Sequence, residues 1–385
     1  MRIIIIIGGK AVFMAKHDND FVDINSSSQV NNVYKKKSGG KTLRIVALVL
    51  SIIMLIAGCG FTFYYKTLDS MNYQEIDRIQ YTATGDQVVS TDSLLQDENV
   101  LNILLFGQDS VAEGGGDKYG RSDTVILMSI DNNNNKLKLT SFQRDTYVAI
   151  PGYGDNKLNA AFTLGGVPLS IATIEANFGV KIDKYACVDF DSFRKIINIL
   201  GGVDIELTTD EIRYINAQID VNNQLSKTSY LEFDNTLADD QKQMMHLDGY
   251  QALWYARNRG VEGLGGNPAY TFSGDDWDRT KRQRNLLETI MNSMKSASVD
   301  DILKIVNEIG PLITTNLKKD DITFLVMNSL DYLSYEMIEI SMPLTGNWVY
   351  GTTRDGQSVI SVTNWNNIRT ELMKFIYEDK VQITN

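Results

Sequence analysis

The 385-residue chain has few of the residues that build disulfide frameworks, zinc sites or hydrolase triads. It contains two cysteines, Cys59 and Cys187, and two histidines, His17 and His246. Cys59 lies in an apolar run and Cys187 lies far outside it, which excludes a disulfide framework. Because His246 is the only histidine beyond the first part of the chain, a multi-histidine zinc site is disfavoured, and a Ser-His-Asp triad would depend on His246 alone.

The chain also lacks the excess positive charge that is typical of nucleic-acid-binding proteins. It has 37 Lys and Arg residues against 48 Asp and Glu residues, a formal net charge of −11. An acidic chain of this kind is a poor candidate for binding DNA or RNA, so no nucleic-acid partner is expected. The hydrophobic content of 43% is ordinary for a globular protein and is sufficient for a sizeable core.

One apolar run is long enough to cross a membrane. Residues 45–65 are almost unbroken in their apolar character, and a helix of this length spans about 30 Å, the thickness of a hydrocarbon core. Lys and Arg residues gather before the run, whereas Asp and Glu follow it, which predicts a cytoplasmic N-terminus. We therefore expect a cytoplasmic tail at 1–44, a transmembrane helix at 45–65 and an extracellular remainder, in a single-pass protein of the cytoplasmic membrane.

The N-terminal region leaves three alternatives open. A cleaved signal peptide is disfavoured because the polar segment before the apolar run is long. The tetrapeptide that ends at Cys59 resembles a lipoprotein cleavage box, which would leave Cys59 as a lipidated N-terminus, although short motifs often match by chance. Met14 is an alternative start, and the tail after it has the polar composition of a disordered segment.

The sequence pattern changes after a polar stretch at 66–98, which we interpret as a stalk or linker. Apolar runs bounded by turn residues predict strands, and helical periodicity predicts helices. Mixed strands and helices with an early hairpin predict an α/β domain over 99–385, with three α-β-α layers and a mixed central sheet. The predicted strands are Val100–Phe106, Thr124–Ile130, Lys136–Phe142, Tyr185–Asp189, Val203–Leu207, Met337–Met342 and Ser358–Val362. The predicted helices are Val167–Phe178, Asp191–Leu200, Asp248–Asn258, Asp278–Met294, Asp320–Leu333 and Trp365–Tyr377, and Thr208–Gln243 is predicted to be a mobile loop.

Several motifs concentrate polar residues at predicted strand and helix ends, where α/β domains place their sites. These motifs are NILLFGQDS (102–110), GRSDTVILMSID (120–131), SFQRDTYVAIPGYGDNKLNAAF (141–162), LDGYQALWYARNRG (247–260) and DDWDRTKRQRNLL (275–287). Arg257 and Arg259 can reach one ligand only if the chain leaves the helix between them. Asp276, Arg279 and Gln283 have i, i+3, i+7 spacing, which places them on one helical face.

Arginine is concentrated in these motifs. Twelve arginines follow Lys66, and seven fall in the motifs: Arg121, Arg144, Arg257, Arg259, Arg279, Arg282 and Arg284. Such a concentration in an acidic chain predicts a dense anion such as phosphate, whose oxygens match the guanidinium fork. Asp109 and Asp123 suit Mg²⁺ or Mn²⁺, and arginine and metal clamps commonly stabilise a transferring phosphoryl group. The alternative is a set of surface salt bridges, each worth below about 1 kcal/mol.

The motifs FGQDS, GRSDT, SFQRD, DNKLNAAF, VDFDSF, LGGVDIEL, YARNR and DWDRTKRQR resemble those of the LytR–CpsA–Psr family of cell-wall assembly proteins. The resemblance is strongest over residues 99–290. It implies a transferase that moves a glycopolymer from a polyprenyl-pyrophosphate carrier onto peptidoglycan, with Mg²⁺ at the pyrophosphate. The polymer stays open between teichoic acid, capsule and another glycan.

The resemblance also assigns roles residue by residue. Asp109 and Asp123 match the metal-associated carboxylates, and the arginines that hold the pyrophosphate match Arg121, Arg144, Arg257, Arg259 and Arg279. In the late D-x-x-R-x-x-R-Q run, Asp276 and Gln283 match the polar positions and Arg282 matches the second arginine, with the neighbouring Asp278 as an alternative to Asp276. Gln283 is also expected to bind the pyrophosphate. Asp145 or Asp276 could accept the proton of the attacking hydroxyl. The candidate catalytic residues are therefore Asp109, Asp123, Arg144, Asp145 and Asp276.

Two other functions use the same residues. A polyprenyl-pyrophosphate hydrolase would differ only in using water as the acceptor. A non-catalytic receptor or regulator that binds wall precursors belongs to a different class. The carboxylates argue against a receptor, because Asp109 and Asp123 would repel a bound anion unless a cation lay between them.

Overall fold

The computed structural model describes residues 4–7, 10–13, 72–81, 89–109, 119–260, 274–296 and 298–378. The chain divides into two units, 1–63 and 64–385. In the first unit, β1 (Ile4–Ile7) pairs with β2 (Lys10–Phe13) as an antiparallel hairpin. The predicted membrane helix at 45–65 lies outside the described residues, and within them no helix is both long and apolar enough to cross a bilayer.

A seven-stranded mixed sheet organises the second unit, in the order β13-β6-β5-β4-β9-β12-β3. Strands β4, β5 and β6 form an antiparallel meander, β9 pairs parallel to β4, and β13 pairs parallel to β6. The strands are β3 (Asn72–Tyr73), β4 (Val100–Gln108), β5 (Ser122–Asp131), β6 (Lys136–Phe142), β9 (Lys184–Asp189), β12 (Thr314–Thr315) and β13 (Glu336–Met342).

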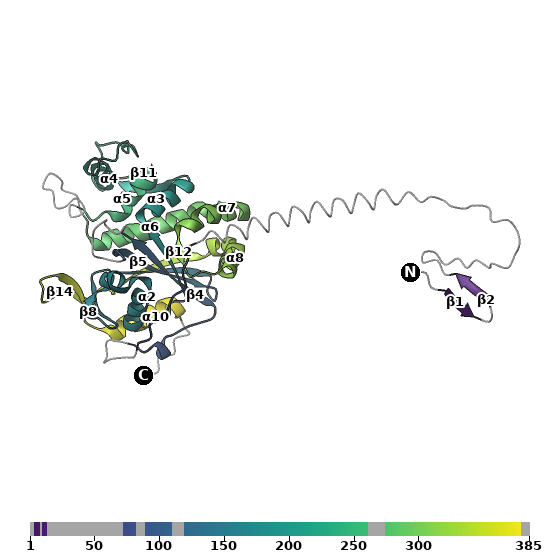
Figure 1. Cartoon of the computed structure of the whole chain (residues 1–385). Coiled ribbons are helices and arrows are strands. Elements are labelled where there is room, and N and C mark those ends of the chain that lie inside the picture. Colours follow the sequence, from purple (N-terminus) through teal and green to yellow (C-terminus); the bar gives the residue numbers. More distant parts are fainter. Residues whose placement is uncertain are drawn as a thin grey trace. The chain divides into compact units, whose positions relative to one another are not determined.

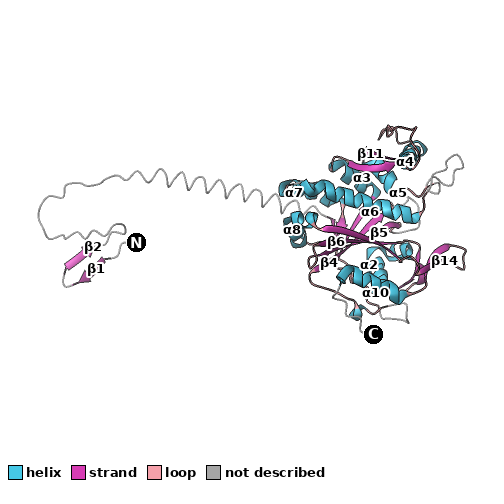
Figure 2. Ribbon diagram, turned by 180° about the vertical axis from the view of Figure 1, so that it is seen from behind, coloured by secondary structure: helices cyan, strands magenta, loops and turns pink. Residues whose placement is uncertain are grey.

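Helices cover both faces of this sheet, as Figures 1 and 2 show. On one face lie α2 (Leu158–Phe178) and α10 (Trp365–Tyr377), whose apolar side chains form one core with Leu104 and Leu127. On the other face lie α6 (Asp276–Ser293), α7 (Val299–Ile309), α8 (Lys319–Met327) and α9 (Ser329–Ser334). The predicted mixed α/β architecture is therefore confirmed for the part of the chain that the structure describes.

Two smaller assemblies flank the main sheet. The first packs α3 (Phe190–Ile199), α4 (Thr209–Val221) and α5 (Gly249–Arg257) with the hairpin of β10 (Val203–Thr208) and β11 (Lys242–Leu247). The second is a four-stranded sheet in the order β14-β15-β7-β8, formed by β7 (Thr146–Ile150), β8 (Gly154–Lys157), β14 (Trp348–Thr352) and β15 (Ser358–Val362). Because β7 follows directly from the end of β6, the second sheet adjoins the carboxyl end of that strand.

Three predictions of secondary structure need correction. Thr208–Gln243 was expected to be a mobile loop, but it contains α4, which a capping box between Thr208 and Glu211 starts and a buried isoleucine face holds in place. The helix expected at Asp320–Leu333 is two helices, α8 and α9, with a break at Asn328. Within the expected linker at 66–98, Asn72–Tyr73 forms β3 at the edge of the main sheet.

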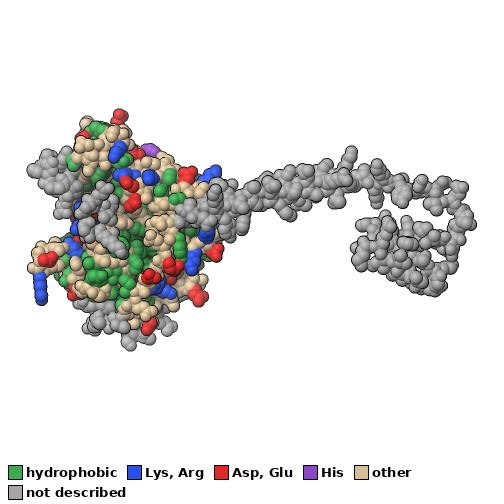
Figure 3. Space-filling model, viewed as in Figure 1, with side chains coloured by type: hydrophobic (Ala, Val, Ile, Leu, Met, Phe, Trp, Pro, Cys, Tyr) green, Lys and Arg blue, Asp and Glu red, His purple; other side chains and the backbone are tan. Residues whose placement is uncertain are grey.

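Charged side chains of both signs are interspersed over the face shown in Figure 3. No large single-sign area covers the described part of that face.

Candidate active site

Arg144 lies at the centre of a cluster of acidic side chains where β6 passes into β7. Its Nη1 atom lies 2.6 Å from Oδ1 of Asp123 at the start of β5. Its Nη2 atom lies 3.3 Å from Oδ1 of Asp276, and its Nε atom lies 3.6 Å from Oδ2 of Asp145. One guanidinium group, only 15% exposed, therefore faces three carboxylates that come from three separate motifs.

Arg279, near the start of α6, is the second arginine of the cluster. Asp276 is the first residue of this helix, and Nη2 of Arg279 donates to its Oδ2 atom at 2.9 Å. Asp275 and Asp278 form the capping box of the helix and are thereby engaged with its backbone. The i, i+3 pair predicted from the spacing is confirmed, and Asp276, rather than the alternative Asp278, faces the cluster.

Arg257 and Arg259 approach the same cluster from α5. The helix ends at Arg257, and Asn258 is extended, with φ −61° and ψ 122°. The expected exit of the chain between the two arginines is therefore confirmed. Arg257 is close enough to Asp123, and Arg259 to Asp276, for each to stabilise the ionised carboxylate. The Arg257 guanidinium stacks on the Phe190 ring at 4.3 Å, which fixes its position.

The environment of the cluster shifts the pKa values of Asp123 and Asp276 in opposite directions. Burial alone would raise the pKa of Asp123, but Arg144 and Arg279 more than offset this effect, so its pKa lies below the usual range. For Asp276, burial outweighs the attraction of Arg279 and Arg144 and raises the pKa. Burial also lowers the pKa of Arg279 to about 10, which leaves this side chain protonated at neutral pH.

Several buried polar atoms around Arg144 have no hydrogen-bond partner. They are Nε of Arg144, Nε of Arg279, Oδ1 of Asp276, Oε1 of Gln143 and Oε1 of Gln283. Buried polar groups are nearly always paired in folded proteins, because an unmade hydrogen bond costs about 1–3 kcal/mol. Two guanidinium N–H groups without an acceptor therefore suit an anion that would bring oxygen atoms to them.

Asp109 and Arg121 lie side by side at the end of the β4–β5 ladder. The backbone N–H of Asp109 donates to the carbonyl oxygen of Arg121 at 2.8 Å, next to a register shift at Gly107 and Gln108. This pairing brings Asp109 to the strand end that also carries Asp123. The structure records no contact between the side chain of Asp109 or Arg121 and the Arg144 cluster.

The donor set fits Mg²⁺ only in company with a substrate. Within the described ranges, no group of three or more His, Cys, Asp or Glu side chains could hold a metal ion. Asp109 and Asp123 offer hard oxygen donors at neighbouring strand ends, and Oδ1 of Asp123 is already paired with Arg144. Mg²⁺ commonly uses one or two carboxylates plus phosphate oxygens and water, so these two carboxylates match that pattern.

Comparison with known proteins decides the family. A family model described as the LytR_cpsA_psr family matches residues 62–372. The chain belongs to the LytR–CpsA–Psr family. The resemblance that the motifs suggested is thereby confirmed.

Relatives of this family member carry transferase names. Polyisoprenyl-teichoic acid–peptidoglycan teichoic acid transferase TagV of Bacillus subtilis is 30% identical over 281 residues, which span 71% of this chain and only 64% of TagV. TagU of Oceanobacillus iheyensis, named for the same activity, is 30% identical over 291 residues, or 73% of this chain and 78% of TagU.

Solved structures support the fold. The crystal structure of B. subtilis TagV has a TM-score of 0.52 at 27% identity and covers 73% of this chain and 98% of TagV. The crystal structure of B. subtilis TagT, at 22% identity, has a TM-score of 0.54 and covers 79% of this chain and 99% of TagT. The TagT similarity supports the fold alone.

In this family member, two of the predicted residues, Arg282 and Gln283, donate hydrogen bonds to backbone carbonyl oxygens at the end of α5. The Arg282 Nε atom pairs with Oε1 of Glu211 at 2.7 Å, and its Nη1 atom donates to the carbonyl oxygen of Asn258 at 3.0 Å. The amide of Gln283 donates to the carbonyl oxygen of Ala256 at 3.3 Å. Both residues therefore fasten α6 to the end of α5, which positions Arg257 and Arg259.

Two residues outside the predicted set also join the site. Nζ of Lys157 pairs with Oδ1 of Asp145 at 2.8 Å, and the amide of Gln143 donates to Oγ1 of Thr280 at 3.0 Å. Both Gln143 and Lys157 stand in the motif at 141–162, which also contains Asp145, the partner of Lys157. Thr280, the partner of Gln143, lies 137 residues further along the chain.

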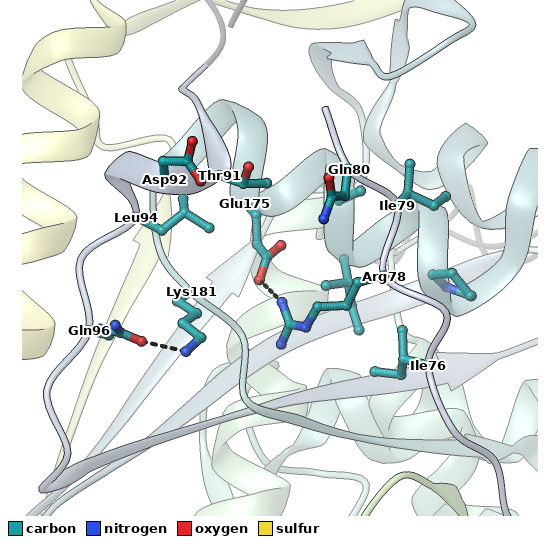
Figure 4. A pocket seen from close by; sticks show the side chains of 13 residues that line it. Ile76, Arg78, Ile79, Gln80, Thr91, Asp92, Leu94, Gln96, Glu175 and Lys181 are labelled. Atoms are coloured by element: carbon teal, nitrogen blue, oxygen red, sulfur yellow. Dashed lines mark hydrogen bonds and ion pairs between the residues drawn. The ribbon is translucent and has the colours of Figure 1, made fainter. Parts of the chain in front are cut away.

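A separate cavity of about 470 Å³ lies between the segment around Arg78 and α2 (Figure 4). Arg78 pairs there with Glu175 at 2.8 Å, and Lys181 donates to Gln96. None of the predicted site residues lines this cavity. It is therefore distinct from the Arg144 cluster.

Proposed function

We propose that the chain is a membrane-anchored phosphotransferase that moves a glycopolymer from a polyprenyl-pyrophosphate carrier onto peptidoglycan. The observation that carries the proposal is the Arg144 cluster, in which the Nε–H groups of Arg144 and Arg279 are buried and make no hydrogen bond. TagV and TagU are named as transferases of teichoic acid to peptidoglycan, which supplies the class of donor and acceptor. The apolar run at 45–65 would hold the domain on the outer side of the cytoplasmic membrane.

In the proposed reaction, the arginines bind the pyrophosphate of the donor. An acceptor sugar hydroxyl attacks the phosphorus on the polymer side, and a new P–O bond forms. The bond between that phosphorus and the bridging oxygen breaks, and polyprenyl phosphate leaves with the electron pair. Arg144 and Arg279, with Arg257 and Arg259 beside them and Arg121 at the strand end next to Asp109, would offset the negative charge that develops on the phosphoryl oxygens.

The hydroxyl proton needs an acceptor. Asp276 suits this role because burial raises its pKa, which makes it a stronger base than Asp123. Asp145 is the other candidate, but its carboxylate already contacts two cations, Lys157 at 2.8 Å and Arg144 at 3.6 Å. We therefore prefer Asp276 as the general base.

Asp109 and Asp123 would hold a Mg²⁺ or Mn²⁺ ion. When bound, such an ion polarises phosphoryl oxygens and offsets their charge. Because Asp123 also contacts Arg144, it would couple the position of the ion to the arginine that faces the pyrophosphate.

The proposal is tested with the full chain in detergent or vesicles and a lipid-linked pyrophosphoryl glycan. Release of polyprenyl phosphate is measured with and without Mg²⁺ and with and without peptidoglycan. We expect release to require Mg²⁺, to rise with acceptor, and to disappear in Asp123→Ala and Arg144→Ala. Arg213→Gln is the matched control, because Arg213 pairs with Asp239 at the surface, outside the cluster.

Two outcomes would contradict the proposal. Release that ignores the acceptor identifies a hydrolase. Donor binding without turnover, unchanged in both cluster variants, identifies a receptor.

A further inference from the structure

Three aromatic side chains form a continuous stack beside the Arg144 cluster. The rings of Trp277 and Trp348 are stacked, with centroids 5.1 Å apart and planes 22° apart. The Tyr350 ring meets Trp348 edge-on, with centroids 4.9 Å apart. We call Trp277, Trp348 and Tyr350 the aromatic shelf.

The shelf begins at the reacting groups and leads away from them. Trp277 directly follows Asp276 at the start of α6. At the other end, Tyr350 lies opposite Ile360, which in turn pairs with Thr146, the residue after Asp145. Adjacent strands are about 4.8 Å apart, so the backbone of Tyr350 lies roughly 10 Å from that of Thr146. The shelf therefore runs from the residue next to Asp276 out to β14, which pairs with β15 beside β7.

The shelf is more exposed than core packing requires. Tyr350, at the outer end of the shelf, is 64% exposed, whereas Trp277 and Trp348 are partly buried. Figures 1 and 2 show β14 projecting at the margin of the domain. Exposed clusters of large apolar side chains commonly mark binding surfaces.

We propose that the aromatic shelf is the acceptor subsite and binds the glycan strand of peptidoglycan. This inference rests on the proposed transferase function and deepens it. A pyranose ring has a flat face of C–H groups and a rim of hydroxyls, so stacking on an aromatic ring removes apolar surface from water while the hydroxyls stay solvated. A sugar seated near Trp277 lies beside Asp276, where its free hydroxyl can reach the bound phosphorus.

The geometry favours a glycan over the isoprenoid chain of the donor. An isoprenoid is apolar on all sides and is stabilised by an enclosed surface. The shelf is exposed at Tyr350 on β14, and the charged side chain of Asp276 adjoins its other end through Trp277. An exposed aromatic surface that ends beside a carboxylate matches a ligand that is apolar on one face and polar at its rim.

The test uses the full chain and glycan strands of peptidoglycan freed of their peptides. The acceptor KM is measured for wild type, Tyr350→Ala and Trp348→Ala, together with direct strand binding by tryptophan fluorescence in the absence of donor. Losing one stacked ring should raise the acceptor KM and the strand Kd about tenfold and leave the donor KM unchanged. Trp348→Phe should stay within about threefold of wild type, because the indole N–H makes no hydrogen bond that could be lost.

Phe324→Ala is the control for an exposed aromatic ring elsewhere, since Phe324 is 56% exposed on α8. Unchanged strand binding in a folded Tyr350→Ala chain would overturn the inference. If wild type binds strands through the shelf but never transfers polymer, the subsite stands and the proposed function fails.

Discussion

Arg279 is the most enclosed arginine of the site, with a side chain only 3% exposed. It is held there by Asp276, by the field of Asp123 and by its place on the first turns of α6. Its Nε–H group nevertheless has no acceptor. A buried charge with an unpaired N–H group costs stability unless a ligand accepts a hydrogen bond from it. Arg279 is therefore the residue whose role depends most on the planar guanidinium fork.

We predict that Arg279→Lys loses most of the activity although it keeps the positive charge. Lysine presents a point charge and cannot contact Asp276 and a phosphate oxygen in one plane. We expect kcat/KM to fall about 100-fold or more, with a small decrease in the melting temperature. Arg213→Lys, on the surface of α4, should behave as wild type. Activity within a few-fold of wild type in Arg279→Lys would show that only charge matters at this position.

At the residue scale, spacing along the chain predicted the components of the site better than their contacts. The i, i+3 spacing of Asp276 and Arg279 placed them together because both lie on one helix. The pair of Asp145 and Lys157 could not be derived in this way, because it depends on how β7 and β8 form a hairpin. Contacts across elements need the tertiary fold.

The β5–β6 hairpin contains a buried ion pair. Nζ of Lys138 lies 2.6 Å from Oδ2 of Asp131, and both side chains are fully buried. The same ammonium group donates to the carbonyl oxygen of Ile376 at 2.8 Å, in the last turn of α10. This pair therefore joins the hairpin to the helix that covers one face of the sheet.

We predict that Lys138→Met destabilises the domain by about 3–5 kcal/mol, because it leaves the Asp131 carboxylate buried without its counter-ion. The double variant Lys138→Met with Asp131→Asn should lose less than the single variant. Urea unfolding of both variants and wild type measures the difference. A loss below about 1 kcal/mol in Lys138→Met would mean that water replaces the ammonium group.

The segment around Arg78 contacts α2 through an ion pair with Glu175, a buried carboxyl group whose protonation depends on pH. Glu175 on α2 is 4% exposed, pairs with Arg78 and accepts the backbone N–H of Ile182. Burial raises the pKa of Glu175, and these partners only partly offset the effect. The folded state therefore binds this proton more tightly than the unfolded state does.

We predict that the Glu175 contribution to stability is fully present below its ordinary pKa and is lost as the pH rises through the raised value. Glu175→Gln removes this dependence and keeps an acceptor for Ile182. The urea midpoint of Glu175→Gln relative to wild type should therefore increase from pH 4 towards neutrality. A constant difference across this range would show that Glu175 has the same pKa in both states.

At the element scale, strong apolar periodicity predicts the bounds of helices and strands, whereas weak periodicity does not. The predicted bounds of β6, β15 and α10 match the structure, since their apolar patterns run to the ends of the elements. The helix predicted at Val167–Phe178 is only the second part of α2, which is kinked at Gly165 and Gly166. In α4, polar residues separate Ile212, Ile215 and Ile219, so the apolar pattern of its buried face is too weak to predict a helix.

At the scale of the whole molecule, the site is assembled from distant segments. Asp123, Arg144, Arg257 and Asp276 come from four motifs that span more than 150 residues, and they meet where the main sheet, the four-stranded sheet and the α3–α5 assembly adjoin. The family model covers the same span. Motif order and arginine content predicted one site, whereas the aromatic shelf from α6 and β14 required the structure.

The central claim is that this site passes the polymer-linked phosphorus to a sugar hydroxyl and not to water. The most direct measurement runs the reaction of the full chain in H₂¹⁸O with lipid-linked polymer, Mg²⁺ and peptidoglycan, followed by muramidase digestion and mass spectrometry. We predict a polymer joined to a wall sugar by a phosphodiester without ¹⁸O, formed by wild type and not by Arg144→Ala. A free polymer phosphomonoester that carries ¹⁸O, with no linked sugar, would contradict the account.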